Sequence, residues 1–251
     1  GLPLGARSVS IQTTLAGGLL ELTAANAAVL DGQLAVRGKL DVGATCPSLD
    51  LVAELDSVAL SDLHRAGWLD PVVTGEVASA RAISRSCGTS LAGHIEQLSA
   101  TVTASGGRIV VGDEWPVTVA AFNVDLKPNE PISASASATV AGEPLEFEVR
   151  TGALQGLSGS VTWPVSLLTK ADGSELRVEG TMGIATPQLV FDVTARLSAL
   201  RIGALHAWLG VASDSAESLS AKARLRLDAS RFVADDIAIN LDGTDLGGSL
   251  T

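Results

Sequence analysis

The chain has few side chains suited to catalysis. It contains three histidines, His64, His94 and His206, and two cysteines, Cys46 and Cys87. A hydrolytic or transfer site needs a nucleophile, a base and an orienting group within reach of one another. No such set surrounds the histidines, and no His or Cys spacing typical of zinc occurs. The sequence therefore predicts a protein that is not an enzyme and that has no metal and no cofactor.

Acidic residues and glycines provide two weaker candidates for chemistry. Asp242-Gly243-Thr244-Asp245 has the carboxylates of a calcium loop, but it lies between two strand patterns and is more typical of a hairpin turn. The pairs Gly106-Gly107 and Gly247-Gly248 lack the Lys-Ser/Thr or the strand-to-helix context of a phosphate-binding loop. We interpret Gly106-Gly107 as a turn that leads into a strand at 108–111.

The two cysteines are more informative. Cys46 precedes a strand predicted at 49–55, and Cys87 follows one predicted at 72–84. If these strands are antiparallel neighbours joined by a helix, both thiols lie at the same end and can form a disulfide. Two separate buried thiols are the alternative. A disulfide would place the protein in an oxidising compartment.

An internal repeat organises the chain. Residues 36–68 are matched by 178–208 at an offset of 142 positions, and each copy is typical of a strand, a turn with a proline, a second strand and a short helix. His64 and His206 occupy the same place in the two copies. We therefore interpret both histidines as architectural rather than as parts of a unique active site.

The four tryptophans also lie in matched places. Trp68 and Trp208 belong to the repeated helix, two positions out of register, and Trp115 and Trp163 each precede Pro-Val. We interpret them as plugs at the ends of sheets or helices. A platform for stacking a ligand is the alternative.

Composition excludes several classes of protein. With 251 residues and 46% hydrophobic content, the chain can bury a core and is not disordered. It has 17 Lys+Arg against 28 Asp+Glu, so neither nucleic acid nor an anionic membrane surface is an expected partner. No segment has the 18 or more apolar residues of a membrane span. Because the chain starts with glycine and stops within a strand pattern, we expect it to be part of a longer protein.

Alternating polar and apolar residues predict a dozen or more strands with one apolar face. Turns are expected at Gly17-Gly18 and Asp31-Gly32, and about three short helices at 60–68, from near Thr89 to Leu98, and at 199–209. Aromatic residues make up only 3% of the chain, so any apolar face is aliphatic. One-sided strands with few helices to cover them need another sheet, a closed barrel or a ligand on the apolar face.

Three stretches carry a resemblance to a known family. They are Leu176 to Gly183 followed by Pro187 to Leu197, the closing run from Leu219 to Leu250, and Ala28 to Asp41. Their degenerate apolar patterning with glycines resembles the AsmA-like family of Gram-negative envelope proteins. The resemblance implies an inner-membrane anchor outside this chain, a periplasmic location, and a long curled β-sheet whose apolar groove carries phospholipid between the inner and outer membranes.

The predicted fold is mainly β: an elongated, twisted, mostly antiparallel sheet curled into an apolar groove, with about three short helices. We expect one continuous domain of two repeat units, 1–110 and 111–251. The expected function is shielding of phospholipid acyl chains, without catalysis, for outer-membrane homeostasis. A secreted β-sandwich or β-solenoid with a structural or adhesive role is the alternative. The candidate groove residues are Leu49, Leu51, Leu55, Phe191, Val193, Leu197, Leu225, Leu227, Ile237 and Ile239.

Overall fold

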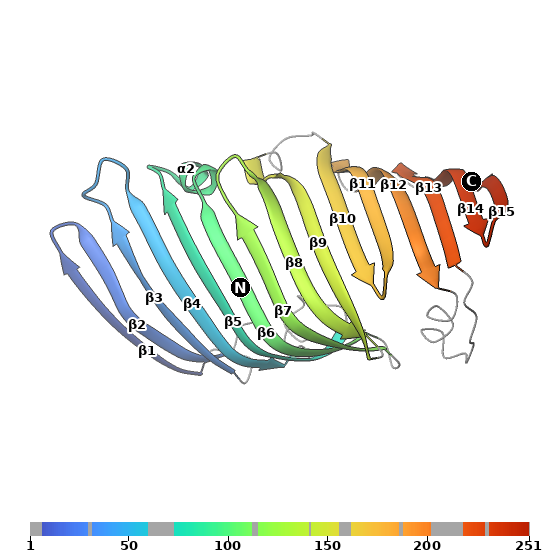
Figure 1. Ribbon diagram of the computed structural model, residues 1–251. Helices are drawn as coiled ribbons and strands as arrows, with labels where there is room; N and C mark the ends of the chain where they lie inside the picture. The colour runs from blue at the N-terminus through green and yellow to red at the C-terminus, as the bar shows by residue number, and fades with distance from the viewer. Residues whose placement is uncertain are drawn as a thin grey trace. The chain divides into compact units, whose positions relative to one another are not determined.

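The protein is mainly β. A computed structural model describes residues 7–29, 32–59, 73–111, 115–140, 142–155, 162–185, 188–201, 218–228 and 231–250. These residues form a 15-stranded sheet whose strand order is the sequence order (Figure 1), and one short helix. The prediction of a mainly β, antiparallel fold with a dozen or more strands is confirmed.

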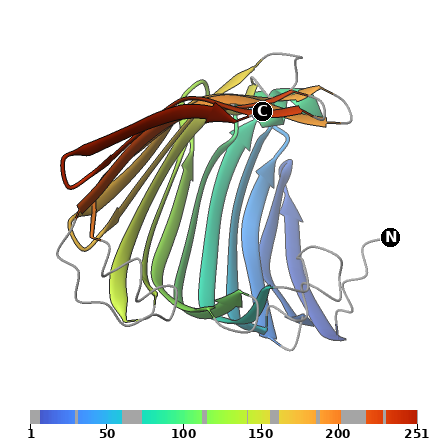
Figure 2. The same ribbon diagram turned by 90° about the vertical axis from the view of Figure 1, so that its right-hand side faces the viewer.

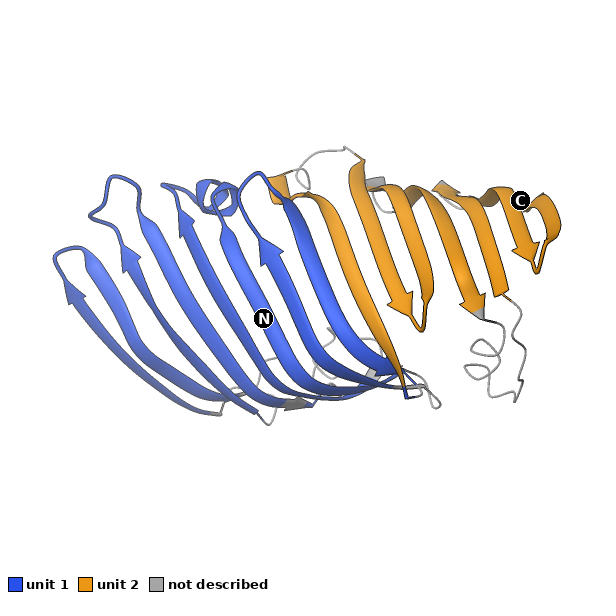
Figure 3. Cartoon of the chain, viewed as in Figure 1, with its two compact units in different colours: residues 1–142 blue, residues 143–251 orange. Residues whose placement is uncertain are grey.

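The chain divides into two compact units, residues 1–142 and 143–251 (Figure 3). Unit 1 contains β1 (Arg7–Ala16), β2 (Leu19–Val29), β3 (Gly32–Asp41), β4 (Ser48–Ala59), β5 (Val73–Cys87), α2 (Leu91–Glu96), β6 (Ser99–Val111), β7 (Trp115–Leu126) and β8 (Pro131–Val140). Unit 2 contains β9 (Glu143–Ala153), β10 (Trp163–Ala171), β11 (Ser174–Ala185), β12 (Gln188–Arg201), β13 (Ser218–Asp228), β14 (Arg231–Leu241) and β15 (Thr244–Leu250). Each copy of the sequence repeat lies in one unit.

Antiparallel pairing gives unit 1 one apolar and one polar face. Residues that lie directly opposite each other on neighbouring strands share a face. Leu55, on β4, lies between Leu34 on β3 and Ala80 on β5, and the series continues through Ala104 to Phe122. The alternate residues of the same strands are mostly charged, Ser or Thr. Figure 2 shows the strands of unit 1 side by side, each curved along its length.

Unit 2 has the same two-faced arrangement. Phe191 on β12 lies opposite Met182 on β11 and Leu227 on β13, and Val193 lies opposite Gly180 and Leu225. Arg and Asp or Glu occupy many alternate positions of these strands. The period of two in the sequence therefore separates apolar from polar side chains across the sheet.

The 142-residue repeat is visible in the backbone. β3 pairs with β4 in the same register in which β11 pairs with β12. For example, Gln33 lies opposite Asp56, and Glu175 and Ser198, each 142 positions later, also lie opposite each other. Ser57 and Ala199, also 142 positions apart, both have a positive φ, of 55° in each case. Such a residue bends a strand at the expense of regular pairing. The two copies thus share a register and a bend as well as a sequence pattern.

Two equivalent glycines let the paired strands approach closely. A Cβ at Gly38 would overlap the carbonyl oxygen of Asp50, and a Cβ at Gly180 would overlap that of Asp192.

We expect Gly180→Ala to lower the free energy of unfolding by about 2 kcal/mol, because overpacking forces the backbone to shift. Chemical denaturation monitored by circular dichroism measures the change. Gly248→Ala is the control: nothing lies within 4 Å of its added Cβ, so a change below about 0.5 kcal/mol is expected. Equal losses for the two variants would contradict the prediction.

The turns and helices agree only in part with expectation. Gly17-Gly18 and Asp242-Gly243 form turns between strands, as predicted, and the second pair lies between β14 and β15 with positive φ at both residues. Gly106-Gly107, however, is not a turn. β6 runs through it without interruption, and Gly106, with φ of 66°, occupies a position inside the strand.

The predicted helix near Thr89 is present as α2. Ser90 caps it, with its Oγ accepting a hydrogen bond from the Gly93 amide at 3.1 Å. It is the one helix among the described residues, so the predicted count of three is not confirmed. The other two predicted helices, at 60–68 and mostly at 199–209, lie outside the described residues, with His64, Trp68, His206 and Trp208. Of the last range, 199–201 belong to the end of β12.

Candidate apolar binding face

The ten predicted groove residues lie on the apolar faces of the two units. In unit 1, Leu49, Leu51 and Leu55 follow one another on β4. In unit 2, Phe191 pairs with Leu227, Val193 with Leu225, and Leu197 with Ala221, which also pairs with Ile239. Ile237 is two residues from Ile239 on β14. Each unit therefore gathers its own candidates on a single face.

The apolar faces are only partly shielded from solvent. The buried hydrophobic residues in the described part of the chain are Ala138, Ala171, Val193, Leu200 and Ala234, and no side chain there is less than 2% exposed. Nine of the ten candidates are half-buried, and Val193 is buried. Few of the described hydrophobic side chains are therefore fully removed from solvent. The aliphatic faces are therefore available for contact with something other than the described strands.

Further residues extend the apolar faces beyond the predicted set. Ile11 and Leu15 on β1 lie opposite Ala25 and Leu20 and are 64% and 74% exposed. Phe122 in unit 1 and Phe232 and Leu246 in unit 2 are also exposed and continue the same faces. The predicted groove residues do not include them. On β1, the alternation of Ile11 and Leu15 with Ser10, Gln12 and Thr14 is the signal that could have found two of them.

The opposite face carries cross-strand ion pairs. In unit 1, Arg37 Nη2 lies 3.1 Å from Glu54 Oε1, Lys39 Nζ lies 3.3 Å from Glu21, and Arg85 lies 3.4 Å from Asp50. A depression of about 420 Å³ on β2 to β5 is lined in part by these charges. Each of the three cations that line the depression already forms an ion pair with a carboxylate. The depression therefore does not have the unpaired cations that an anion-binding site needs.

In unit 2 a bidentate ion pair joins β12 and β13. Asp192 accepts hydrogen bonds from Arg224 Nε at 2.8 Å and Arg224 Nη2 at 2.6 Å. These bonds hold the pKa of the Asp192 carboxyl below its ordinary value of 3.8, and they raise the pKa of the Arg224 guanidinium. Both side chains are more than 40% exposed, so the pair contributes little to stability.

We expect the protein to lose a small part of its stability in acid, when the Asp192 carboxyl of the Asp192–Arg224 pair becomes protonated. The carboxyl has a lower pKa when folded, so its contribution is complete above the unfolded value and is lost as pH falls through the folded value. Asp192→Asn should destabilise the protein at pH 7, and the difference from the parent should vanish well below pH 3.8. Urea unfolding at both pH values measures it. A difference that is the same at both would contradict the assignment.

The disulfide predicted from strand ends is present. Cys46 and Cys87 are bonded, with Cα atoms 5.7 Å apart, and β4 and β5 are antiparallel neighbours in which Ser48 lies opposite Cys87. The Gly88 amide donates to the Pro47 carbonyl at 2.9 Å at the same end. No free cysteine is found among the described residues. Disulfides persist in oxidising environments, which favours an extracytoplasmic location.

Trp163 and His94 also make structural contacts. Trp163 Nε1 donates to the Ala153 carbonyl at 3.0 Å, and its ring lies against Gly152, where a Cβ would overlap it. His94 Nδ1 lies 2.9 Å from Ser86 Oγ, beside the disulfide. Both contacts link neighbouring elements, and that of Trp163 agrees with the packing role expected for the tryptophans.

The described residues contain no group of three or more His, Cys, Asp or Glu side chains placed to hold a metal ion. In the same part of the chain no helix has the length and hydrophobicity needed to cross a membrane. Comparison of the chain with protein-family models, curated proteins and solved structures gives no match.

Proposed function

We propose that this chain is a periplasmic lipid-binding segment of an AsmA-like envelope protein, and that its apolar faces line a groove for phospholipid acyl chains. In this role it shields lipid during transfer between the inner and outer membranes and has no catalytic activity. An anchor outside the chain would connect the parent protein to the inner membrane. The resemblance of Leu176 to Leu197 and of the closing run to that family gives the proposal its starting point.

The observation that supports the proposal best is the incomplete burial of the apolar faces. Leu49, Leu51 and Leu55 in unit 1 and Phe191, Leu225 and Leu227 in unit 2 are half-buried, and Ile11, Leu15 and Phe232 on the same faces are exposed. Contiguous apolar surface of this kind is rare in monomeric soluble proteins unless it binds something. A flexible aliphatic ligand suits a face that is itself aliphatic and poor in aromatic groups.

The energetics of acyl burial are favourable. Each methylene moved from water to an apolar surface gains about 0.8 kcal/mol, so half of a fatty-acid chain supplies several kcal/mol before ordering costs. The polar faces carry paired charges such as Arg37–Glu54 and Asp192–Arg224, which remain hydrated. Binding that relies on the acyl chains should tolerate different headgroups.

Lipid extraction tests the proposal directly. Protein purified from a periplasmic expression host should release phospholipid on organic extraction, and native mass spectrometry should show lipid adducts. The delipidated protein should then bind a fluorescent phospholipid. A lipid-free protein that also fails to bind the fluorescent lipid would favour the alternative, a secreted sandwich or solenoid whose apolar faces pack on each other.

A further inference from the structure

The β3–β4 pair in unit 1 and the β11–β12 pair in unit 2 are close to interchangeable on their apolar faces. Four positions are identical between the copies: Leu34 and Leu176, Val36 and Val178, Ala53 and Ala195, and Leu55 and Leu197. The close glycine contact is also common to both, at Gly38 and Gly180. If apolar packing alone decided the pairing, β3 would be expected to fit against β12 almost as well as against β4.

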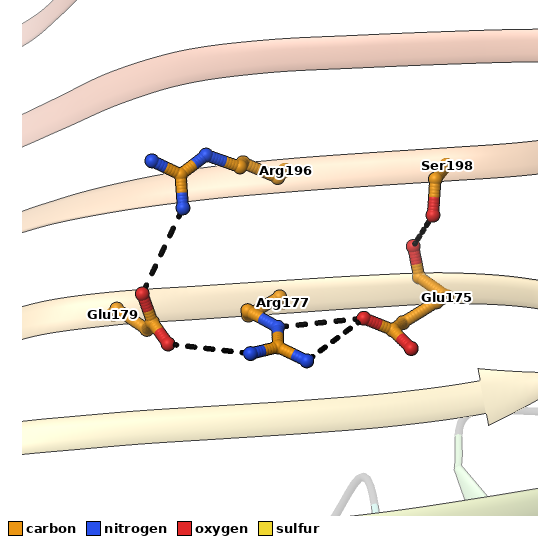
Figure 4. Close-up of polar contacts among 5 residues, drawn as sticks. All are labelled: Glu175, Arg177, Glu179, Arg196 and Ser198. Atoms are coloured by element: carbon orange, nitrogen blue, oxygen red, sulfur yellow. Dashed lines mark hydrogen bonds and ion pairs between the residues drawn. The ribbon is translucent and has the colours of Figure 1, made fainter.

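The polar faces of the two pairs differ in the sign of one ion pair. In unit 1, Arg37 on β3 faces Glu54 on β4, with Nη2 and Oε1 3.1 Å apart. At the positions 142 residues later, Glu179 on β11 faces Arg196 on β12, with Oε2 and Nη1 3.7 Å apart (Figure 4). The contact is kept and its charges are reversed.

We propose that this charge reversal prevents strands of the two copies from pairing with each other. If β3 paired with β12 in the native register, Arg37 would face Arg196. If β11 paired with β4, Glu179 would face Glu54. Misassembly between similar units is a characteristic failure of repeat proteins, and like charges placed against the wrong partner are a general means of avoiding it.

The neighbouring charges make the two exchanges unequal. Arg177 lies directly opposite Arg196 in the native pair and would lie opposite Glu54 in the β11–β4 exchange, which partly offsets the Glu179–Glu54 repulsion. Lys39 lies opposite Asp50 in the native pair and would lie opposite Asp192 in the β3–β12 exchange, so this contact does not discriminate. In the β3–β12 exchange Ala35 would replace Arg177 opposite Arg196, which removes one like-charge pair. The repulsion between Arg37 and Arg196 is the contact that opposes this exchange.

Three charge-swapped variants test the proposal. Arg37→Glu/Glu54→Arg gives both copies the arrangement of unit 2, and Glu179→Arg/Arg196→Glu gives both that of unit 1. The quadruple variant reverses both copies and so restores the difference between them. The parent and the three variants have the same net charge and keep an opposite-charge pair at each site.

Each of the four proteins is unfolded in urea with its disulfide intact and refolded at low concentration. The native monomer recovered is measured by size-exclusion chromatography and circular dichroism.

We expect misfolded or oligomeric material to increase about threefold or more in each double variant, given the usual strength of exposed ion pairs, and to return to the parent level in the quadruple variant. If the variants differed only in the stability of their native states, the four proteins would rank in a different order. Glu54 also lies 3.3 Å from Arg81, and Glu179 lies 3.7 Å from Arg177, so Glu54→Arg and Glu179→Arg each create a repulsion. These losses add in the quadruple variant. If that variant refolds worst, or if all four refold equally, the proposal is wrong.

Discussion

Replacing Phe191 or Leu225 with aspartate should remove most of the bound lipid while leaving the protein folded. Phe191 lies opposite Leu227, and Leu225 lies opposite Val193 on the same apolar face. A carboxylate there would stand among acyl chains, where an unpaired charge is strongly disfavoured. We expect lipid content to fall about tenfold or more, since 1.4 kcal/mol already corresponds to a factor of ten. Both side chains are half-buried rather than fully buried, so we expect the carboxylate to hydrate once lipid has left.

Ser220→Asp provides the matched control. Ser220 is on the same strand as Leu225 but on the opposite face, is exposed, and lies opposite Asn240. This variant should retain its lipid. Lipid content is measured by native mass spectrometry and folding by thermal circular dichroism. If Leu225→Asp unfolds the protein instead, by the 3–5 kcal/mol typical of a buried unpaired charge, the apolar face is the core of a sandwich and the lipid proposal fails.

The parts of the fold that the sequence predicts well depend on period and repetition. Alternation from Leu49 to Leu55 and from Phe191 to Leu197 predicts strands and the side chains that share a face, because successive side chains in a strand point to opposite sides. Each strand also pairs with the next one in sequence, so little long-range information is needed to place it. The disulfide followed from the same reasoning about strand ends.

The parts that were wrong or missed depend on pairing. A glycine with positive φ fits a turn as well as a bend inside a strand. Gly106-Gly107 belongs to a strand because β6 is paired on both sides: Gly107 lies opposite Val77 on β5 and Val119 on β7. Likewise, Arg37 and Glu179 occupy equivalent positions with opposite charges. Their ion pairs can be recognised as reversed only when the registers of both strand pairs are known. Single-sequence patterns carry neither piece of information.

Removal of the Cys46–Cys87 disulfide should give the largest loss of stability of any change considered. The bond closes a loop with a sequence separation of 41 residues, which includes β4 and β5. In the chain-entropy model, closing such a loop stabilises the folded state by about 4 kcal/mol. Among the residues that the structure describes, no large side chain is less than 2% exposed, so little buried packing compensates for its loss. Cys46→Ser/Cys87→Ser should therefore have a much lower urea midpoint, and reduction of the parent protein should lower its midpoint by the same amount.

Three comparisons separate the disulfide from the side chains themselves. Intact mass with and without reduction and alkylation should show no reactive thiol in the unreduced parent protein. Cys46→Ser alone should be as unstable as the double variant under reducing conditions, because each lacks the same bond. Adding reductant to the double variant should change nothing. If the double variant unfolds at the same urea concentration as the oxidised parent, the strand pairing between β4 and β5 is sufficient by itself, and the predicted stabilisation is wrong.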